Sequence, residues 1–334
     1  MVTSHDVARL AGVSQPTVSR ALRNSTKVSE DTRYRVLQAA RALGYVPSET
    51  GRALSSGRTR RIGLLLTDLT NQFYTHVIAD MHDELETRGY QLMLQTETTD
   101  TATVAERLIA NTVDGVLLAT VTLNSLIPVR LRDRGVPFVY FNRISDAVDA
   151  DSATVDPVSG LDAAAAAILT HGHRRVGAIL GPSNTSTGAQ REVALRRGLE
   201  AGGVTIASAY TYRGPFDFDT GDAGTKYLLT RDPRPTVIVC SNDVVALGAL
   251  NAARDLGVKV PQDVSVVGFD NLPPAQWSLI QLTTVAFDLD GMARRAANLL
   301  VDRIENGPGT PFAHAVFPSR LIERATLSVA PPLS

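Results

Sequence analysis

The chain has 334 residues, of which 44% are hydrophobic and 20% charged, and its formal net charge at pH 7 is −1. These values predict two or three globular domains with sizeable cores. No apolar run is long enough to span a bilayer, and the first residues lack the apolar stretch of a secretory signal, so we expect a cytoplasmic protein. A single cysteine, Cys240, excludes an internal disulfide and a cysteine-rich metal site.

Positive charge is concentrated at the amino-terminal end. Residues 1–61 contain 11 Arg and Lys against 4 Asp and Glu, whereas the remainder contains 22 against 30. A basic segment joined to an acidic body is typical of a protein whose terminal domain binds phosphate groups of a nucleic acid.

Two short helical patterns lie within this basic segment, in the stretch DVARLAGVSQPTVSRAL. We predict one helix from about Ser4 to Ala11 and a second from about Gln15 to Leu22, with Gly12 ending the first. Two helices joined in this way form a helix-turn-helix, whose second helix enters the major groove of DNA. A purely structural helical hairpin fits the same spacing, but the charge distribution favours DNA binding.

A third helix is predicted from Ser29 to about Leu43, and residues 1–47 therefore form a small helical domain. The next segment, 48–60, contains a helical stretch too short to be stable alone in water. We interpret it as a hinge or linker before a body that spans 61–330.

Three motifs, DVARLAGVSQPTVSRAL, KVSEDTRYRVLQAARALGYVPS and ALSSGRT, resemble the amino-terminal domain of the LacI family of bacterial transcriptional regulators, and the architecture is purine-repressor-like. The resemblance implies a homodimeric, ligand-responsive repressor of a near-palindromic operator, without enzymatic activity and without a cofactor. It also implies that Leu54 enters the minor groove from a hinge helix formed on DNA, although Leu54 could instead be an ordinary linker residue. The residues expected to contact DNA are Ser14, Gln15, Pro16, Thr17, Ser19, Arg20, Asn24, Lys27 and Leu54.

From Arg61 onward, short apolar runs alternate with helical stretches, which predicts parallel sheets covered by helices on both faces. The expected strands are Ile62–Leu66, Gln91–Leu94, Val116–Leu118, Phe138–Phe141, Val176–Leu180, Thr236–Cys240 and Val264–Gly268. The expected helices are His76–Arg88, Thr103–Asn111, Leu161–Thr170, Ala189–Ala201 and Val244–Leu256, of which the first and last are candidates for a dimer face.

The resemblance implies two doubly wound, periplasmic-binding-protein-like lobes joined by three crossovers, near Pro157, Phe287 and Ser319. The first lobe would comprise about 62–157 plus 288–318. The second would comprise about 158–286 plus 320–330.

Ligands of open α/β sheets bind beyond the carboxyl ends of the strands, and polar and aromatic residues follow several of the predicted strands. By resemblance, the effector-binding residues are Phe73, Tyr74, Thr187, Arg191, Phe216, Asn242 and Asp270. Three of them have structural alternatives: Asn242 as a helix cap, Asp270 as a turn residue and Arg191 as half of a surface ion pair. Gln276 and Trp277 could close the pocket, and Phe287 stands where the family often has glutamine.

A mixture of aromatic faces and hydrogen-bonding groups suits a small polar ligand, a sugar more than a purine. Two other functions fit a two-lobed body: a solute-binding module of sugar transport, and a nucleobase-responsive regulator that needs a corepressor. A nicotinamide-dependent enzyme is excluded because TDLTNQFY, after the first strand, lacks the glycine-rich phosphate-binding pattern. We expect no metal, since His171 and His173 have no third ligand at a suitable spacing.

Overall fold

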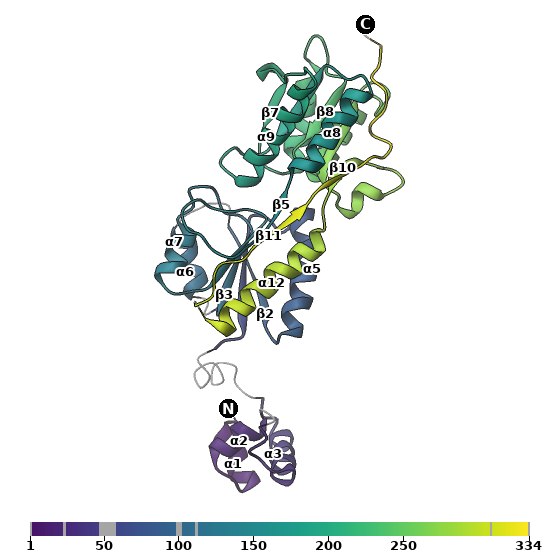
Figure 1. Cartoon of the computed structure of the whole chain (residues 1–334). Helices are drawn as coiled ribbons and strands as arrows, with labels where there is room; N and C mark the ends of the chain where they lie inside the picture. The colour runs from purple at the N-terminus through teal and green to yellow at the C-terminus, as the bar shows by residue number, and fades with distance from the viewer. Residues whose placement is uncertain are drawn as a thin grey trace. The chain divides into compact units, whose positions relative to one another are not determined.

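The computed structural model describes residues 2–22, 25–46, 58–97, 102–110, 113–307 and 309–332. Asn24 and Leu54, two of the predicted DNA contacts, lie outside these residues. The chain folds into two compact units, Met1–Thr59 and Arg60–Ser334, which are drawn in Figure 1.

The first unit is a bundle of three helices, α1 (Ser4–Ala11), α2 (Gln15–Leu22) and α3 (Glu30–Ala42). Gly12 ends α1 in the left-handed conformation, with φ of 64°, as the sequence predicted. The helices enclose a small apolar core: Val7, Ala8, Ala11, Val18, Ala21, Val28, Val36, Ala39 and Ala40.

The second unit contains two six-stranded sheets, one in each of two lobes. The order of the first sheet is β11 (His314–Pro318), β5 (Ser152–Asp156), β4 (Phe138–Phe141), β3 (Gly115–Leu118), β1 (Arg61–Leu66) and β2 (Gln91–Thr96). The order of the second is β12 (Arg320–Ile322), β10 (Thr283–Ala286), β9 (Ser265–Asp270), β8 (Val237–Cys240), β6 (Val176–Leu180) and β7 (Thr211–Arg213). Neighbouring strands are parallel except β10 and β12.

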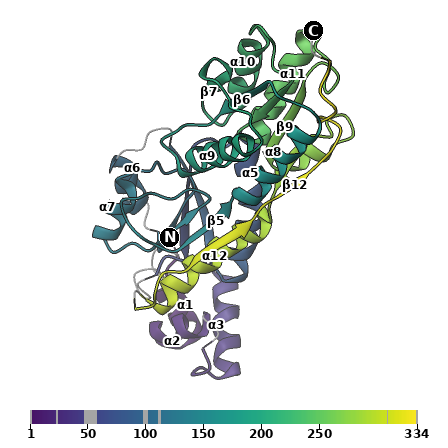
Figure 2. The ribbon, with the colours of Figure 1, turned by 45° about the horizontal axis from the view of Figure 1, so that its top comes forward.

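Helices cover both faces of each sheet (Figures 1 and 2). In the first lobe, α5 (Gln72–Thr87) and α12 (Leu289–Asn306) lie on one face, and α6 (Ala102–Ala110) and α7 (Ile127–Asp133) on the other. In the second, α8 (Val158–Thr170) and α9 (Ser186–Ala201) lie opposite α10 (Phe218–Leu229) and α11 (Asp243–Asp255). Two short 3-10 helices, Ser208–Tyr210 and Pro273–Gln276, complete this lobe.

Alternate residues of one strand serve opposite faces of a sheet, and β1 illustrates this arrangement. Leu64 packs toward α5 and α12, whereas Leu65 packs toward α6 and α7. A strand buried on both faces must be apolar throughout, which explains the continuous run Ile62–Leu66. The predicted fold class, a helical head and two parallel α/β lobes, is confirmed.

The chain passes between the two sheets at three places, Pro157, Phe287 and Ser319. The Ser319 hydroxyl joins two of them, because it donates to the carbonyl of Asp156 (2.7 Å) and accepts from the N–H of Gly160 (3.1 Å). A Cβ at Gly160 would lie 2.3 Å from Val285, so only glycine allows the connections to lie so close together. Figure 2 shows β11 and β12 running along this shared side of the lobes.

Several elements begin or end at other residues than the sequence predicted. Helix α5 starts at Gln72 rather than His76, because the Asn71 side chain accepts a hydrogen bond from the N–H of Phe73 (3.0 Å). Helix α9 starts at Ser186 rather than Ala189, because Thr185 caps it by accepting from the N–H of Gly188 (3.1 Å). Phe73, Tyr74 and Thr187 therefore lie in first helical turns rather than in loops.

Five strands were not predicted: β5, β7, β10, β11 and β12. All five lie at or next to the edge of a sheet, and most are short and carry polar residues. Their sequences lack the continuous apolar run that marks a central parallel strand. Within the described ranges, no helix is both long and apolar enough to cross a membrane.

Close packing of α10 against α11 generates the first prediction. A Cβ at Gly248 would lie 2.1 Å from the carbonyl oxygen of Phe218, so Gly248→Ala must push the helices apart. We expect a loss of stability of about 1–3 kcal/mol, measured by chemical or thermal unfolding. Gly309→Ala is the matched control, because nothing lies within 4 Å of the added methyl group. Equal stability of the two variants would contradict this account.

Candidate functional site

The exposed surface of the helical head contains most of the predicted DNA contacts. Pro16, Arg20 and Lys27 are exposed, and no hydrogen bond or ion pair engages the Arg20 side chain within the described residues. The hydroxyls of Ser14 and Thr17 bond to each other (2.8 Å), and Gln15 donates to Ser4 of α1 (3.3 Å). Arg20 is thus available to a DNA base edge, whereas Gln15 would have to exchange a partner within the protein. Ser19 is half-buried on the same helix.

The second unit has a cavity of about 520 Å³ between its lobes, beyond the carboxyl ends of the strands. A volume of this size is typical of small-molecule sites. All seven predicted effector residues lie on its walls: Phe73, Tyr74, Thr187, Arg191, Phe216, Asn242 and Asp270. Contact of these residues with a ligand stays a prediction.

Arg191 and Asp270 form a buried ion pair at the base of the cavity. The guanidinium donates to Asp270 (2.9 Å) and to the carbonyl of Ser241 (2.8 Å), and the exposed fractions of Arg191 and Asp270 are only 6% and 2%. Burial lowers the pKa of Arg191, and Asp270 partly offsets that effect. Burial raises the pKa of Asp270 to about 6, against the opposing influence of Arg191.

A second buried carboxyl group, Asp243, lies behind this pair. It accepts hydrogen bonds from the Thr284 hydroxyl (2.5 Å) and from the N–H of Leu272 (2.8 Å). Burial, and then the nearby Asp270, raise the pKa of Asp243 to about 8 despite those two hydrogen bonds. Asp243 is therefore mostly uncharged at neutral pH.

Three aromatic side chains, Phe73, Tyr74 and Phe216, lie on the wall of the cavity. Phe73 packs edge-on against Tyr74, with ring centroids 5.5 Å apart, and both rings are more than nine-tenths buried. The guanidinium of Arg143 lies over the Phe216 ring, with its Cζ 5.1 Å from the ring centroid. The Cζ of Arg191 lies 6.0 Å from the same centroid. The planes of Phe73 and Tyr74 meet at 83°, so these two neighbouring rings are not parallel.

Both lobes contribute to the cavity, and three hydrogen bonds connect them around it. Asn71 donates to the carbonyl of Phe216 (2.8 Å), the N–H of Leu123 donates to the carbonyl of Asn184 (2.9 Å), and the N–H of Ile144 donates to the Ser186 hydroxyl (3.0 Å). A ligand in the cavity would touch both lobes and hence be sensitive to their separation.

Among the buried side-chain polar atoms of the described residues that lack a hydrogen-bond partner, five belong to residues of the cavity wall: Thr120 Oγ1, Asn142 Oδ1, Arg143 Nε, Thr187 Oγ1 and Arg191 Nε. Because a buried polar atom without a partner is costly, these five positions are candidates for contacts with a ligand. Asn142 and Asp270 also have positive φ values, 63° and 112°, a strained conformation typical of functional sites.

Three of these residues, Thr120, Asn142 and Arg143, were missed by the sequence reasoning. A signal was present, since Asn142 and Arg143 directly follow a predicted strand that ends at Phe141. Thr120 likewise comes two residues after β3. The rule that singled out Asn242 and Asp270 applies equally to these positions.

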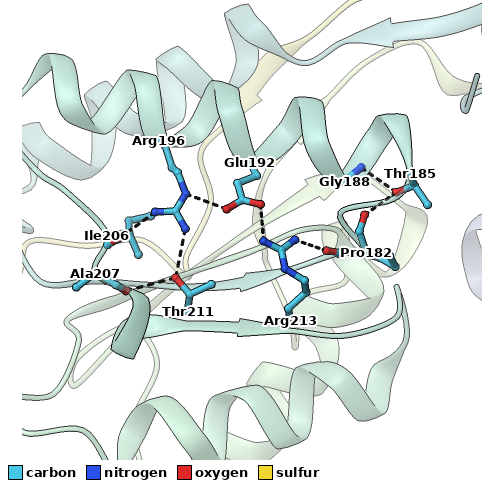
Figure 3. Close-up of polar contacts among 10 residues, drawn as sticks. Pro182, Thr185, Gly188, Glu192, Arg196, Ile206, Ala207, Thr211 and Arg213 are labelled. Carbon is cyan, nitrogen blue, oxygen red and sulfur yellow. Dashed lines mark hydrogen bonds and ion pairs between the residues drawn. The ribbon is translucent and has the colours of Figure 1, made fainter. Parts of the chain in front are cut away.

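An ionic network, shown in Figure 3, connects α9 to the edge strand β7. Glu192 accepts from Arg196 (2.9 Å) and from Arg213, and Arg213 also donates to the carbonyl of Gly181 (2.7 Å). Burial alone would raise the pKa of Glu192, but the hydrogen bonds from Arg213 and Arg196 outweigh it and lower the pKa. The network positions Arg191, one residue before Glu192, relative to the strand that leads to Phe216.

Some predicted roles are not supported by the geometry. Gln276 and Trp277 do not line the cavity, and Trp277 is 59% exposed. The 3-10 helix Pro273–Gln276 leads this part of the chain away from the cavity. Asn242 lines the cavity and also caps α11, accepting from the N–H of Val245 (2.9 Å). Phe287 packs behind the cavity against Phe269, with ring centroids 6.0 Å apart.

The contacts of His173, Cys240 and His76 are those of structural residues. His173 is buried between the Thr236 hydroxyl and the carbonyl of Ser328, and burial raises the pKa of the Cys240 thiol. In the described ranges, His76, Asp80 and Asp290 are close enough together to hold a cation, but His76 bonds to Asp290 (2.8 Å) and Asp80 pairs with Arg294.

Comparison with known proteins agrees with this arrangement. Residues 3–48 match the family model "Bacterial regulatory proteins, lacI family", and residues 165–327 match "Periplasmic binding protein-like domain". The HTH-type transcriptional repressor PurR of Shigella sonnei is 32% identical over 99% of this chain and 98% of its own length. The chain belongs to the LacI family of bacterial regulatory proteins. It is a DNA-binding transcriptional repressor and not an enzyme.

Two solved structures extend the comparison. The transcriptional regulator CelR in complex with cellobiose is 32% identical, with a TM-score of 0.72, over 98% of this chain and all of that one. The lac repressor dimer bound to operator and the anti-inducer ONPF is 23% identical, with a TM-score of 0.85, over 97% of this chain and 98% of that one, and shares the fold.

The raised pKa of Asp243 predicts how stability depends on pH. A carboxyl group whose pKa is higher in the folded state than in the unfolded one stabilises the fold at low pH, and that contribution is lost as pH rises toward 8. Asp243→Asn should remove this dependence, so the variant should lose less of its melting temperature than the wild type between pH 6 and 9. Asp255→Asn, at an exposed position of the same helix, is the control. Parallel pH profiles for wild type and Asp243→Asn would refute the assignment.

Proposed function

We propose that this repressor binds a near-palindromic operator as a homodimer and that a sugar or sugar derivative in the cavity releases it. The observation that carries the sugar assignment is the set of unpartnered polar atoms on the wall, from Thr120, Asn142, Thr187 and Arg191. They are spread over both lobes, as the several hydroxyls of a sugar require. A purine presents its polar atoms in one plane and favours parallel aromatic faces, which Phe73 and Tyr74 do not offer.

Relatives of equal identity include both the transcriptional repressor PurR and the regulator CelR in complex with cellobiose. The surroundings of the Phe216 ring favour the sugar, because Arg143 already covers one of its faces. A nucleobase corepressor remains the alternative outcome of the ligand experiments below.

For DNA recognition, we propose that Arg20 contacts a base while Lys27 contacts phosphate. A guanidinium can donate two hydrogen bonds to O6 and N7 of one guanine, and no partner among the described residues competes for Arg20. Ser14, Gln15, Pro16, Thr17, Ser19 and Asn24 would complete the contact surface. Leu54, in the hinge, would act as a wedge in the minor groove.

Arg20→Ala should weaken binding to the specific operator by about 1–3 kcal/mol and relax preference at one symmetric base position. Gel-shift titrations against operators with single base changes measure both effects. Lys27→Ala is the control, because loss of a phosphate contact weakens binding to all sequences alike. If Arg20→Ala behaved in the same uniform way, the base contact would be disproved.

Control of DNA binding would follow from the angle between the lobes. The first strand of the first lobe begins at Arg61, directly after the hinge segment 48–60, so rotation of that lobe would change the separation of two hinges in a dimer. Hinges held apart could not pair, and alone they are too short to remain helical. A coupling of about 1–3 kcal/mol is typical of such systems.

Arg191→Ala should bind operator but no longer be released by an inducing sugar. If the ligand is instead a corepressor, the same variant should lose tight operator binding. Gel-shift titrations with and without ligand distinguish these results, and a normal response would remove Arg191 from the site.

Because Arg191→Ala leaves the buried Asp270 without its partner, it can also destabilise the fold. Thr187→Val avoids this problem, since the Thr187 hydroxyl has no partner in the protein and the two side chains have similar shapes. Loss of one ligand hydrogen bond should raise the ligand concentration needed for release about 3- to 10-fold. The melting temperature without ligand should not fall, because the hydroxyl that is removed is buried without a partner.

A further inference from the structure

Among the ionisable residues of the cavity wall, Arg143 is the one whose side chain makes no hydrogen bond within the described residues. It follows β4 at the carboxyl end of the first sheet, and its Nε is buried without a hydrogen-bond partner. No carboxylate or carbonyl accepts from its side chain within the described residues, and its contact is with the face of the Phe216 ring. A guanidinium has five N–H donors, so most of the donors of Arg143 are available to a ligand.

The acidic residues of the wall do not compensate the charge of Arg143, because each is engaged elsewhere. Asp68 accepts from the N–H and the hydroxyl of Thr70, and Glu97 pairs with Arg107 (3.1 Å). Two further carboxylates, Asp217 and Asp270, accept from the N–H of Thr220 and from Arg191. The positive charge on this side of the cavity is therefore not balanced by a carboxylate in contact with it.

Other donors converge on the same region from the second lobe. Helix α9 begins at Ser186, and the first N–H groups of a helix have no intrahelical acceptor and attract anions. Thr187, which is 4% exposed, lines the cavity and has an unpartnered hydroxyl, and the Nε of Arg191 is also unpartnered. Burial lowers the pKa of Arg191, and the charge of Arg143 lowers it further, so an anion between the two guanidinium groups would relieve their repulsion.

We propose that Arg143 is a specificity-determining residue that binds an oxyanion group of the effector, so that the ligand is a phosphorylated or carboxylated sugar rather than a neutral one. Arg143 would supply charge-assisted hydrogen bonds, with Thr187 and the start of α9 on the other side of the anion. The inference deepens the proposed function, because it takes the cavity to be the effector site.

The test uses the full chain and free anions, which do not require the sugar to be known. Inorganic phosphate, acetate and chloride are compared at equal ionic strength and pH by thermal unfolding. We expect phosphate, acetate or both to raise the melting temperature by about 2 °C or more at 50 mM relative to chloride. Phosphate acting alone indicates a phosphorylated ligand, and acetate acting alone indicates a sugar acid.

Variants assign the effect to the site. Arg143→Gln should abolish the rise, Arg143→Lys should keep most of it, and Arg132→Gln, which removes an exposed charge from α7, should leave it unchanged. The basic helical head is unchanged in all of these variants. A rise in melting temperature caused by anion binding to the head would therefore persist in Arg143→Gln. Absence of a rise in the wild type, or an equal rise in Arg143→Gln, overturns the proposal.

Failure of this inference is distinguishable from failure of the proposed function. Release of the operator by a neutral sugar, without any anion effect, would remove the role of Arg143 and leave ligand control intact. An anion effect that depends on Arg143, in a protein whose operator affinity no ligand alters, would support the anion site and contradict ligand control.

Discussion

The second lobe depends on the pairing of two charges that water does not reach. Arg191 of α9 must be compensated where it is buried, and Asp270 at the end of β9 provides that compensation, with the carbonyl of Ser241 after β8. A helix and two strands are thereby joined at one point. Removing either partner of such a pair is far more costly than forming it is favourable, so the pair defines geometry more than it adds stability.

Around that rigid point, the rest of the cavity is incompletely bonded. Within the described residues, the hydroxyls of Thr120 and Thr187 and the Nε atoms of Arg143 and Arg191 are buried without partners, while Glu192, Arg196 and Arg213 connect α9 to β7. Side chains whose own positions are fixed, but whose hydrogen bonds are unused, form a preorganised binding site. The two lobes share this site through only a few hydrogen bonds, and a ligand could therefore alter their relation at modest cost.

Local signals predicted local structure well, and pairings distant in sequence could not be predicted. Gly12 ends α1 and Ser29 caps α3 by accepting a hydrogen bond from the N–H of Thr32, and the helices of the head lie where the sequence predicted them. The edge strand β7 and the polar strand β5, which lies between β11 and β4, have no such signal, because neither sequence contains a continuous apolar run. Arg191 and Asp270 were each singled out, yet nothing near either in the sequence indicates that they pair. Arg143 and Asn142 were predictable, since they follow a recognised strand, but the interpretation favoured positions matched by resemblance.

The three crossovers also determine when each lobe can be completed during synthesis. The first lobe takes its main core helix from Leu289–Asn306 and an edge strand from His314–Pro318, so residues 62–156 leave the ribosome long before α12 can cover them. The apolar face that α12 covers stays exposed while the whole second lobe is translated. A nascent chain of this kind exposes an unfinished sheet for most of its synthesis, a condition in which chaperones and early aggregation compete.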